Sequence, residues 1–344
     1  MKKVIVYIAL FAAIGLASCE RLIMPKKTST KTVDVFEEVW STMDKGYSFF
    51  AYRNISWDSM HMIYRFGISD TLSERHLFDS CANMLAALQD RGVTLYAGFG
   101  TAYYDNTYKY KSNFNKSLLE QKYWPGCERT GPFMYKVIDS VSYVYYGNFD
   151  DHIDDGQVES VISRLKNLGA KRSMILDVRN STGSNTANMF TLLKHLGLDS
   201  AGFEYTYYLY QTQYKTGPKH DDFTDFEGTW IDKNDSKKFA RYIVILTNRG
   251  MYGIPSLFAT SAKAMQTVKI MGDTTAGIGG LTTSKELANG WVLTYTSSKI
   301  RSSDGFEIID GVAPDTIVSM KSSDESAGKD TMIEAALAEL KIKP

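Results

Sequence analysis

Two segments of this chain repeat one local pattern: a short aliphatic run, a turn that contains glycine, and then an amphipathic helix. The first begins with residues 173–178 (SMILDV) and the second with residues 242–247 (YIVILT). Apolar runs of this length, bounded by turn residues, are typical of buried strands, and the apolar spacing after each turn is helical. The repetition predicts an α/β layered fold in which the strand ends form the edge best suited to a functional site.

The N-terminal part of the chain has a different texture, because helical patterns follow one another with no strand between them. Residues 33–45 place apolar side chains at helical spacing, and a further helix is expected over residues 77–88, preceded by a capping-box candidate at Thr71–Glu74. Beyond this region β-branched and aromatic residues become frequent. We therefore divide the chain into a helical cap at residues 32–92 and an α/β core at residues 93–344.

The first residues have the features of a targeting segment rather than of folded structure. Residues 1–19 contain two early lysines, a short apolar stretch and the sequence LASC, which resembles the lipobox of bacterial lipoproteins. We expect Cys19 to be lipidated and to become the mature N-terminus; a cleaved secretory signal with an incidental cysteine is the alternative. Residues 20–31 then form a polar linker. Diacylation gives stable anchoring, so the expected membrane contact is a lipid anchor only.

This anchor predicts a place in the bacterial cell envelope, on the outer membrane facing the periplasm, with the choice of leaflet left open. An oxidising compartment permits a disulfide between Cys81 and Cys127. Cys81 lies on the apolar face of its helix, however, which favours a buried free thiol. Lysine plus arginine and aspartate plus glutamate both total 39. Without net charge or a basic stripe, a nucleic-acid partner is not expected.

Short motifs rich in glycine and aspartate are spread over the second half of the chain. They are Asp177–Asn180 with Gly183, Leu246–Arg249, Ile270–Gly277, Leu287–Gly290, Gly311–Asp315 and Gly328–Asp330. Together, in this order, they resemble the C-terminal processing (tail-specific) serine peptidases, particularly the branch related to the core of the tricorn protease. The resemblance extends from about residue 34 to the C-terminus.

The resemblance implies an α/β core of stacked ββα units, like that of crotonase and the Clp peptidase, beneath an N-terminal helical cap. Many relatives carry a peptide-recognising PDZ domain between cap and core. Only about 45 residues separate Tyr96 from Ser142 here. Because that is too short for such a domain, we expect the PDZ domain to be absent.

The resemblance also implies where the catalytic groups should stand. Relatives place the nucleophilic serine just after the second strand and turn, and the matching residue here is Gly253. The general base of the tricorn-like branch is a histidine, and its match is Gly92. Glu307 or Asp310 lies near the third, acidic position of the family. The nucleophile and the base are therefore both replaced by glycine.

Loss of both groups predicts a binding site in place of a catalytic one. A serine hydroxyl needs an adjacent base to take its proton, and glycine supplies neither group. The backbone N–H of Ile254 and the N–H region around Gly183 match the oxyanion donors of the family. The turn at residues 181–184 (STGS) replaces a glycine-rich sequence of the relatives, which restricts the backbone there. We expect an inactive homologue that holds a peptide or protein C-terminus by strand addition.

An active serine-type endopeptidase with relocated residues is the alternative. Ser256, almost one turn beyond Gly253, is its candidate nucleophile, although a local cap or a core position suits this serine equally well. The other branch of the family uses a lysine as base, and Lys263 and Lys285 are nearby but stand in no matching motif. A histidine base would have to be one of His61, His76, His152, His195 and His220. A role unrelated to peptides, such as glycan binding, is a further possibility.

No metal and no cofactor is expected. His152 lies in an acidic run at residues 150–155 that lacks the spacing of a calcium-binding loop, so a solvated loop followed by a helix cap explains it better. Residues 277–280 (GIGG) lack the lysine and hydroxyl residue that follow a phosphate-binding loop, which favours a simple turn.

Overall fold

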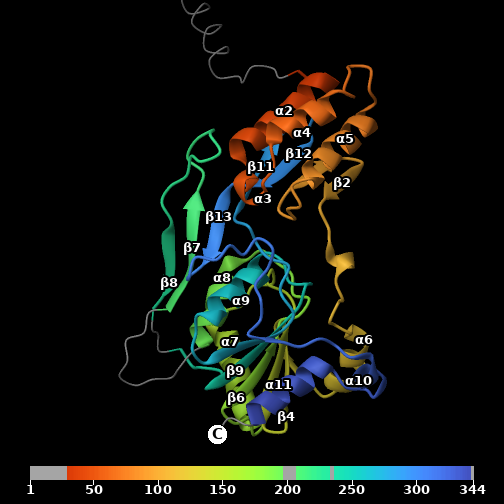
Figure 1. Cartoon of the computed structure of the whole chain (residues 1–344). Coiled ribbons are helices and arrows are strands. Elements are labelled where there is room, and N and C mark those ends of the chain that lie inside the picture. Colours follow the sequence, from red (N-terminus) through yellow and green to blue (C-terminus); the bar gives the residue numbers. More distant parts are fainter. Residues whose placement is uncertain (1–28, 197–206, 233–235, 342–344) are drawn as a thin grey trace, which may run out of the picture.

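A computed structural model describes residues 29–196, 207–232 and 236–341 and shows an α/β core below a helical cap (Figure 1). The α/β class and the N-terminal cap predicted from the sequence are confirmed. The predicted signal segment, Cys19 and most of the predicted linker lie outside the described residues. No helix within the described ranges is long and apolar enough to cross a membrane.

A seven-stranded sheet forms the centre of the core. In spatial order its strands are β14 (Thr316–Ile317), β10 (Val268–Gly272), β9 (Tyr242–Thr247), β6 (Ser173–Asp177), β5 (Val141–Tyr146), β4 (Phe133–Ile138) and β3 (Glu128–Thr130). The two runs predicted as buried strands, β6 and β9, are parallel neighbours, with Ser173 opposite Tyr242. Strands from β5 to β14 are parallel, and β4 and β3 continue the sheet in the antiparallel sense.

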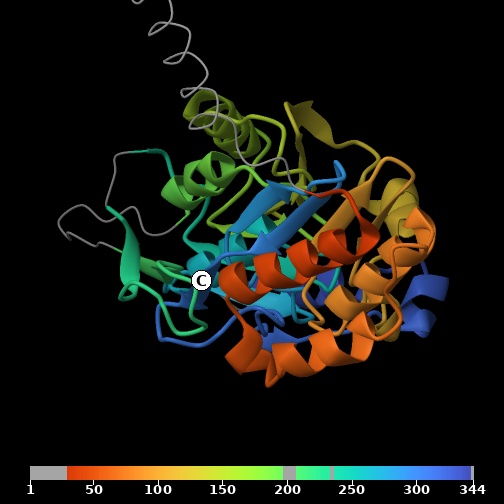
Figure 2. The same ribbon diagram turned by 90° about the horizontal axis from the view of Figure 1, so that it is seen from above.

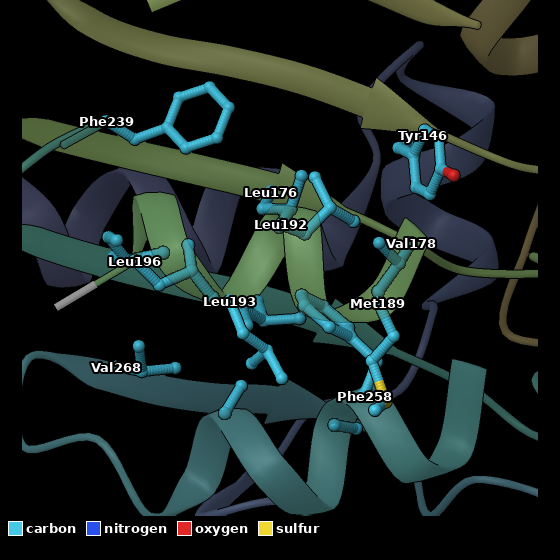
Figure 3. Close-up of a cluster of buried hydrophobic side chains, with 14 of the residues drawn as sticks. Tyr146, Leu176, Val178, Met189, Leu192, Leu193, Leu196, Phe239, Phe258 and Val268 are labelled. Atoms are coloured by element: carbon cyan, nitrogen blue, oxygen red, sulfur yellow. The ribbon is translucent and has the colours of Figure 1, made fainter. Parts of the chain in front are cut away.

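Helices cover both faces of this sheet. One face carries α7 (Asp155–Asn167), α8 (Thr186–His195) and α9 (Ile254–Lys263), and the other carries α6 (Lys116–Leu118), η2 (Leu119–Tyr123) and α11 (Thr331–Lys341). Successive strand residues point to opposite faces. Leu176 of β6 therefore packs with Leu192 of α8 and Phe258 of α9 (Figure 3), whereas its neighbour Ile175 packs with Ile333 of α11.

The cap combines helices with a second sheet. Its helices are α2 (Thr32–Gly46), α3 (Phe50–Arg53), α4 (Trp57–Arg65) and α5 (Glu74–Ala86), and its strands, in order, are β11 (Thr282–Glu286), β12 (Val292–Thr296), β1 (Thr94–Ala97) and β2 (Gly100–Tyr103). Phe36 and Phe78 pack in one cluster with Leu95 and Leu293. Figure 2 shows α2, in red, lying over the strands. The cap core thus extends beyond residue 92 and includes strands from distant parts of the chain.

The start of α5 differs from the predicted capping box. The N-cap is Ser73, whose hydroxyl oxygen accepts a hydrogen bond from the His76 N–H at 3.4 Å. Leu72 N–H donates to the Ser69 carbonyl, so Thr71 belongs to the preceding turn. The helix therefore begins at Glu74, and Thr71 does not cap it.

A three-stranded sheet stands beside the core (Figure 1). Its strands, in order, are β13 (Ser298–Ser302), β7 (Tyr207–Tyr214) and β8 (Glu227–Ile231). Between β2 and β3 the described chain forms only η1 (Thr107–Lys109), α6 and η2, and it holds no PDZ domain there. The remaining short helix is α10 (Ser322–Ser326), ahead of α11.

Candidate active site

Gly253 lies in the turn between β9 and α9, where the resemblance places the nucleophile. It is the N-cap of α9, with φ 74° and ψ −129°, a backbone region that strongly favours glycine. A nucleophilic serine in a strand-to-helix elbow is held in a sharp, strained turn of this kind. A β-carbon added at Gly253 meets nothing nearer than the Gly183 carbonyl oxygen, at 4.0 Å. The backbone has the shape of a nucleophile elbow, with open space where the side chain would stand.

Two backbone N–H groups lie close to this open space. Ile254 is the first residue of α9, and the N–H groups of the first helical turn have no partner within the helix, so the Ile254 N–H is free at the helix tip beside Gly253. Within the described residues, neither the Ile254 N–H nor the Gly183 N–H donates to a protein acceptor. Gly183 has φ 122°, and a β-carbon there would lie 2.6 Å from the Asp150 nitrogen. Glycine is therefore required at 183, and both N–H groups are available to an oxygen acceptor.

Gly92, where the resemblance places the histidine, lies beside the side chain of Tyr252, a residue of the elbow. A β-carbon added at Gly92 would lie 2.5 Å from the Thr296 hydroxyl oxygen and 3.2 Å from the Tyr252 hydroxyl oxygen. Tyr252 directly precedes Gly253, so the fold does bring the two predicted positions together. The space that a histidine side chain at position 92 would enter is already filled by Thr296 and Tyr252.

Asp90 is the buried anchor of this corner. Its two carboxylate oxygens accept hydrogen bonds from the Gly92 N–H at 2.7 Å and from the Thr296 hydroxyl at 3.0 Å. Burial raises the pKa of Asp90, and these hydrogen bonds oppose the rise. Burial, followed by the charge of Asp90, raises the pKa of Tyr252 as well. Tyr252 is therefore a neutral phenol at ordinary pH and is unsuited to act as a base.

The two candidate acids occupy different places. Asp310 lies at the site, where it forms an ion pair with Arg53 at 2.9 Å and accepts a hydrogen bond from the Tyr52 hydroxyl at 3.1 Å. Glu307 is half-buried, and its Oε2 has no hydrogen-bond partner within the described residues. Burial raises the pKa of Glu307, against the opposing charges of Lys299 and Arg301. Asp310 and Tyr252, the residue before Gly253, line one cavity, and Glu307 does not line it.

Ser256, the alternative nucleophile, is fully buried. Its hydroxyl donates to the Met251 carbonyl at 2.8 Å and accepts from the Gly277 N–H at 3.1 Å. The Gly277 carbonyl in turn accepts from the Gly253 N–H at 3.0 Å. Ser256 thus joins the elbow to the GIGG turn, and both the donor and an acceptor position of its hydroxyl are in use.

The residues predicted as alternative bases lie elsewhere. Lys285 pairs with Glu38 at 3.0 Å, and Lys263 pairs with Asp315 at 3.1 Å. In the described chain none of the histidines contacts Ser256. His61 pairs with Glu37, His76 with Ser73, His195 with Asp155 and the Lys237 carbonyl, and His220 with Asp44, while His152 is exposed.

A buried ion network was not predicted from the sequence, although its residues stand in the family motifs. Arg179 donates to both carboxylate oxygens of Asp177, at 2.8 and 2.7 Å, and to Asp330 at 3.0 Å. All three side chains are fully buried. The charges of Asp177 and Asp330 raise the pKa of Arg179 despite its burial, whereas burial raises the pKa of Asp330 against the charge of Arg179. The network ties the end of β6 to the start of α11, directly below the elbow region.

A cavity of about 370 Å³ opens beside the elbow, and we call it the elbow cavity. It was also not predicted from the sequence, because Arg91 and Arg249 lie far apart in the chain and no local pattern brings them to one space. Its lining holds four cations and one carboxylate. The lining residues are Arg53, Gln89, Arg91, Tyr104, Asn106, Lys109, Tyr110, Arg249, Tyr252, Ala276, Ile309 and Asp310.

Comparison with known proteins matches both parts of the chain. Peptidase family S41 matches residues 140–318, and the Tricorn protease C1 domain matches residues 31–86. A protein of Staphylococcus haemolyticus named as a CtpA-like serine protease is 27% identical over 183 residues, which are 53% of this chain and 34% of that protein. The match thus spans about a third of the length of this curated relative.

Solved structures share the fold. A candidate peptidase from Parabacteroides merdae aligns with a TM-score of 0.85 and 29% identity, over 92% of this chain and 98% of that chain. The photosystem II D1 C-terminal processing protease aligns at 0.54 with 16% identity, over 85% and 94%. The tricorn protease aligns at 0.53 with 14% identity, over 90% of this chain and 36% of its own. The last two are likenesses of fold alone.

Proposed function

This chain belongs to peptidase family S41, as its motifs predicted, and on that premise we propose that it is a catalytically inactive homologue that binds a peptide or protein C-terminus beside its elbow. A lipid on Cys19 would hold it at the bacterial cell envelope, at the outer membrane facing the periplasm. The family domain supplies the scaffold, and the residues at the elbow support the finer proposal.

The observation that carries the proposal is the pair of glycines at one corner of the molecule. Acyl transfer needs an attacking oxygen and a base that takes its proton. Gly253 has no side chain, and a side chain at position 92 would meet Thr296 and Tyr252. Both groups of the reaction are therefore absent from the positions where the family carries them, and the local packing has closed over one of them.

The contacts of Ser256 oppose the alternative of an active peptidase. Its hydroxyl already bonds two backbone groups of the protein, and the side chain is fully buried. A nucleophile must reach a substrate carbonyl and must pass its proton to a base. Ser256 would have to leave the junction between the elbow and the GIGG turn to do either.

Features suited to binding are present at the same corner. The free N–H of Ile254 stands at the positive end of the α9 dipole, and the Gly183 N–H lies nearby. Such groups hold a carbonyl or carboxylate oxygen without chemistry. An extended peptide bound by main-chain hydrogen bonds would use them for alignment, which is the mode of strand addition.

A serine-directed fluorophosphonate probe tests the proposed inactivity. We expect no covalent labelling of the purified protein, under conditions that fully label an active serine peptidase run in parallel. The decisive control is Ser256→Ala. Stoichiometric labelling of the parent that this variant abolishes would refute the proposal and support the relocated-serine alternative.

Binding is tested separately from catalysis. The protein is incubated with a defined peptide library, and the retained and free peptides are identified by mass spectrometry. We expect a subset to be retained with intact termini after hours of incubation. New termini that accumulate with protein concentration would refute inactivity, and the absence of any retained peptide would refute the proposed binding role.

The lipid anchor is tested with a clickable fatty acid in growing cells. We expect the parent to incorporate the label and to fractionate with outer membranes, and Cys19→Ser to do neither. Unchanged membrane association of an unlabelled Cys19→Ser protein would refute this part of the proposal.

A further inference from the structure

We propose that the elbow cavity is a carboxylate site, in which Arg91 and Arg249 hold a carboxylate of the bound polypeptide. The inference rests on the proposed function, because it specifies which chemical group the ligand presents beside the elbow. The carboxylate belongs to the chain terminus or to an acidic side chain close to it.

The charges of the lining are unbalanced. Four cationic residues, Arg53, Arg91, Lys109 and Arg249, face a single carboxylate, that of Asp310. Asp310 is fully engaged, since Arg53 contacts its two oxygens at 2.9 and 3.1 Å. Three lining cations therefore have no carboxylate partner in the lining. A confined site with such an excess of one charge raises the local concentration of ligands with the opposite charge.

Two carboxylates behind the lining do not remove this excess. Asp273 lies 3.9 Å from the Nε of Arg249, but it already accepts hydrogen bonds from the Asn113 side chain and the Thr274 N–H. Asp90 is buried beneath Gly92 and uses both oxygens in the bonds described above. Neither presents a free acceptor to the cavity.

Unused donors point to an oxygen ligand. The Nη1 of Arg91 and the Nε of Arg249 are buried and have no hydrogen-bond partner within the described residues. The Nη1 of Arg249 makes only long contacts of 3.4 Å, to the Thr275 and Asp310 carbonyls. A guanidinium cannot lose its charge, so a buried donor without an acceptor is unfavourable. A carboxylate offers the matching pair of acceptor oxygens.

Aromatic rings hold these two guanidinium groups in place. Arg91 lies over the ring of Tyr252, 4.8 Å from its centroid, and Arg249 lies over the ring of Tyr110 at 4.3 Å. Cation–π contacts of this kind fix the planar group without using its N–H donors. The donors therefore remain available, and the site is arranged before a ligand arrives.

The position of the cavity suits the end of a peptide. Tyr252 lines the cavity and directly precedes Gly253, so the cavity begins one residue from the elbow. Its volume of about 370 Å³ lies at the low end of ligand pockets, which span roughly 300–1,000 Å³. A cavity of this size fits one or two residues, and the rest of the polypeptide would extend past the elbow.

Three N-acetylated hexapeptides of one sequence without other ionisable groups test the inference by fluorescence anisotropy. The first has a free C-terminal carboxylate, the second is amidated, and the third is amidated with glutamate at its last position. We expect the plain amidated peptide to bind about tenfold or more weakly than the acidic peptide whose carboxylate occupies the site. A loss of this size is what removal of one charge-assisted hydrogen bond produces. Whichever acidic peptide keeps its affinity identifies the source of the carboxylate.

Arg91→Gln and Arg249→Gln should each weaken binding of the acidic peptide about tenfold or more and leave the amidated peptide unaffected. Arg91→Lys and Arg249→Lys keep the charge but lose the paired N–H donors of the planar guanidinium. They should give intermediate losses of affinity. Arg172→Gln is the matched control, because Arg172 is exposed just before β6. Its replacement removes the same charge far from the cavity. Thermal melts of all variants confirm folding.

The outcomes separate the two proposals. Equal affinity of acidic and amidated peptides, or equal losses in Arg91→Gln and Arg172→Gln, would overturn the carboxylate site while leaving peptide binding intact. If the unsubstituted protein binds none of the three hexapeptides and no peptide of the library, the proposed function is overturned, and this inference with it. Inorganic phosphate that competes more strongly than the acidic peptide would show a phosphate site instead and would also overturn the inference.

Discussion

A methyl group at position 92 should destabilise the fold through one identifiable contact. In Gly92→Ala the new β-carbon would lie 2.5 Å from the Thr296 hydroxyl oxygen, well inside normal van der Waals distance. Gly92 does not have a positive φ, so alanine is permitted by the backbone itself. Thr296 must therefore move, and its hydrogen bond to the buried Asp90 carboxylate, at 3.0 Å, is lost.

The magnitude follows from two opposing effects. A hydrogen bond to a charged group contributes about 1.5–3 kcal/mol. Replacement of glycine by alanine restricts the unfolded chain and stabilises the fold by about 0.4–1 kcal/mol. The net loss expected for Gly92→Ala is about 0.5–2.6 kcal/mol. Thr296→Ala alone removes the same hydrogen bond and should cost about 1.5–3 kcal/mol.

A double-mutant cycle measured by urea unfolding separates the steric contact from other effects. Because the hydrogen bond can be lost only once, Gly92→Ala should be neutral or slightly stabilising in the Thr296→Ala background. Gly98→Ala is the matched control, since a β-carbon at Gly98 meets nothing within 4 Å. Additive losses in the cycle, or a Gly92→Ala midpoint equal to that of Gly98→Ala at unchanged m-value, would refute the reasoning. The same contact implies that a histidine at 92 requires a smaller residue at 296.

Three further predictions concern the buried ion network, the elbow, and the thiols of Cys81 and Cys127. Asp330→Asn leaves the buried Arg179 paired with Asp177 and weakens only its bonds to Asp330, so it should destabilise the fold by about 1.5–3 kcal/mol in urea unfolding; an unchanged or stabilised variant would contradict this role of Asp330. Gly253→Ser must adopt φ 74° and should lose about 1–3 kcal/mol, and a stabilised variant would show that the elbow has relaxed. Cys81 and Cys127 are both free, and burial raises the pKa of Cys81 to about 12. At pH 8, below this pKa, its thiol stays protonated, so DTNB should label half-buried Cys127 first and Cys81 only after unfolding; equal rates in the folded protein would refute this.

The local elements were predictable because their signals depend on near neighbours in the chain. The aliphatic runs of β6 and β9 are buried on both faces, so each reads as an unbroken apolar segment. The turn at Gly253 was predictable because it lies between a buried strand and an amphipathic helix, and the structure then shows its positive φ. The predicted N-cap of α5, Thr71, lies two residues before the observed N-cap, Ser73. Threonine and serine both suit a helix N-cap, and only the preceding turn selects between them.

The elbow cavity was not predictable in the same way. Arg91 and Arg249 were visible in their motifs, but no local pattern shows that both guanidinium groups face one space. Glu307 and Asp310 both carry a carboxylate and lie three residues apart, and only the path of the loop turns Asp310 toward Arg53. Such choices depend on segments that approach from different parts of the chain.

The sequence by itself determined the α/β layering and the S41 family, and it predicts Gly253 and Gly92 at the positions of the nucleophile and the base. These follow from the residue types present and from periodicities that neighbouring residues set. Only the tertiary structure decided that Thr296 and Tyr252 fill the space beside Gly92 and that arginines with unused donors gather next to it. Contacts between segments some two hundred residues apart arise from the packing of the whole fold, and no local pattern encodes them.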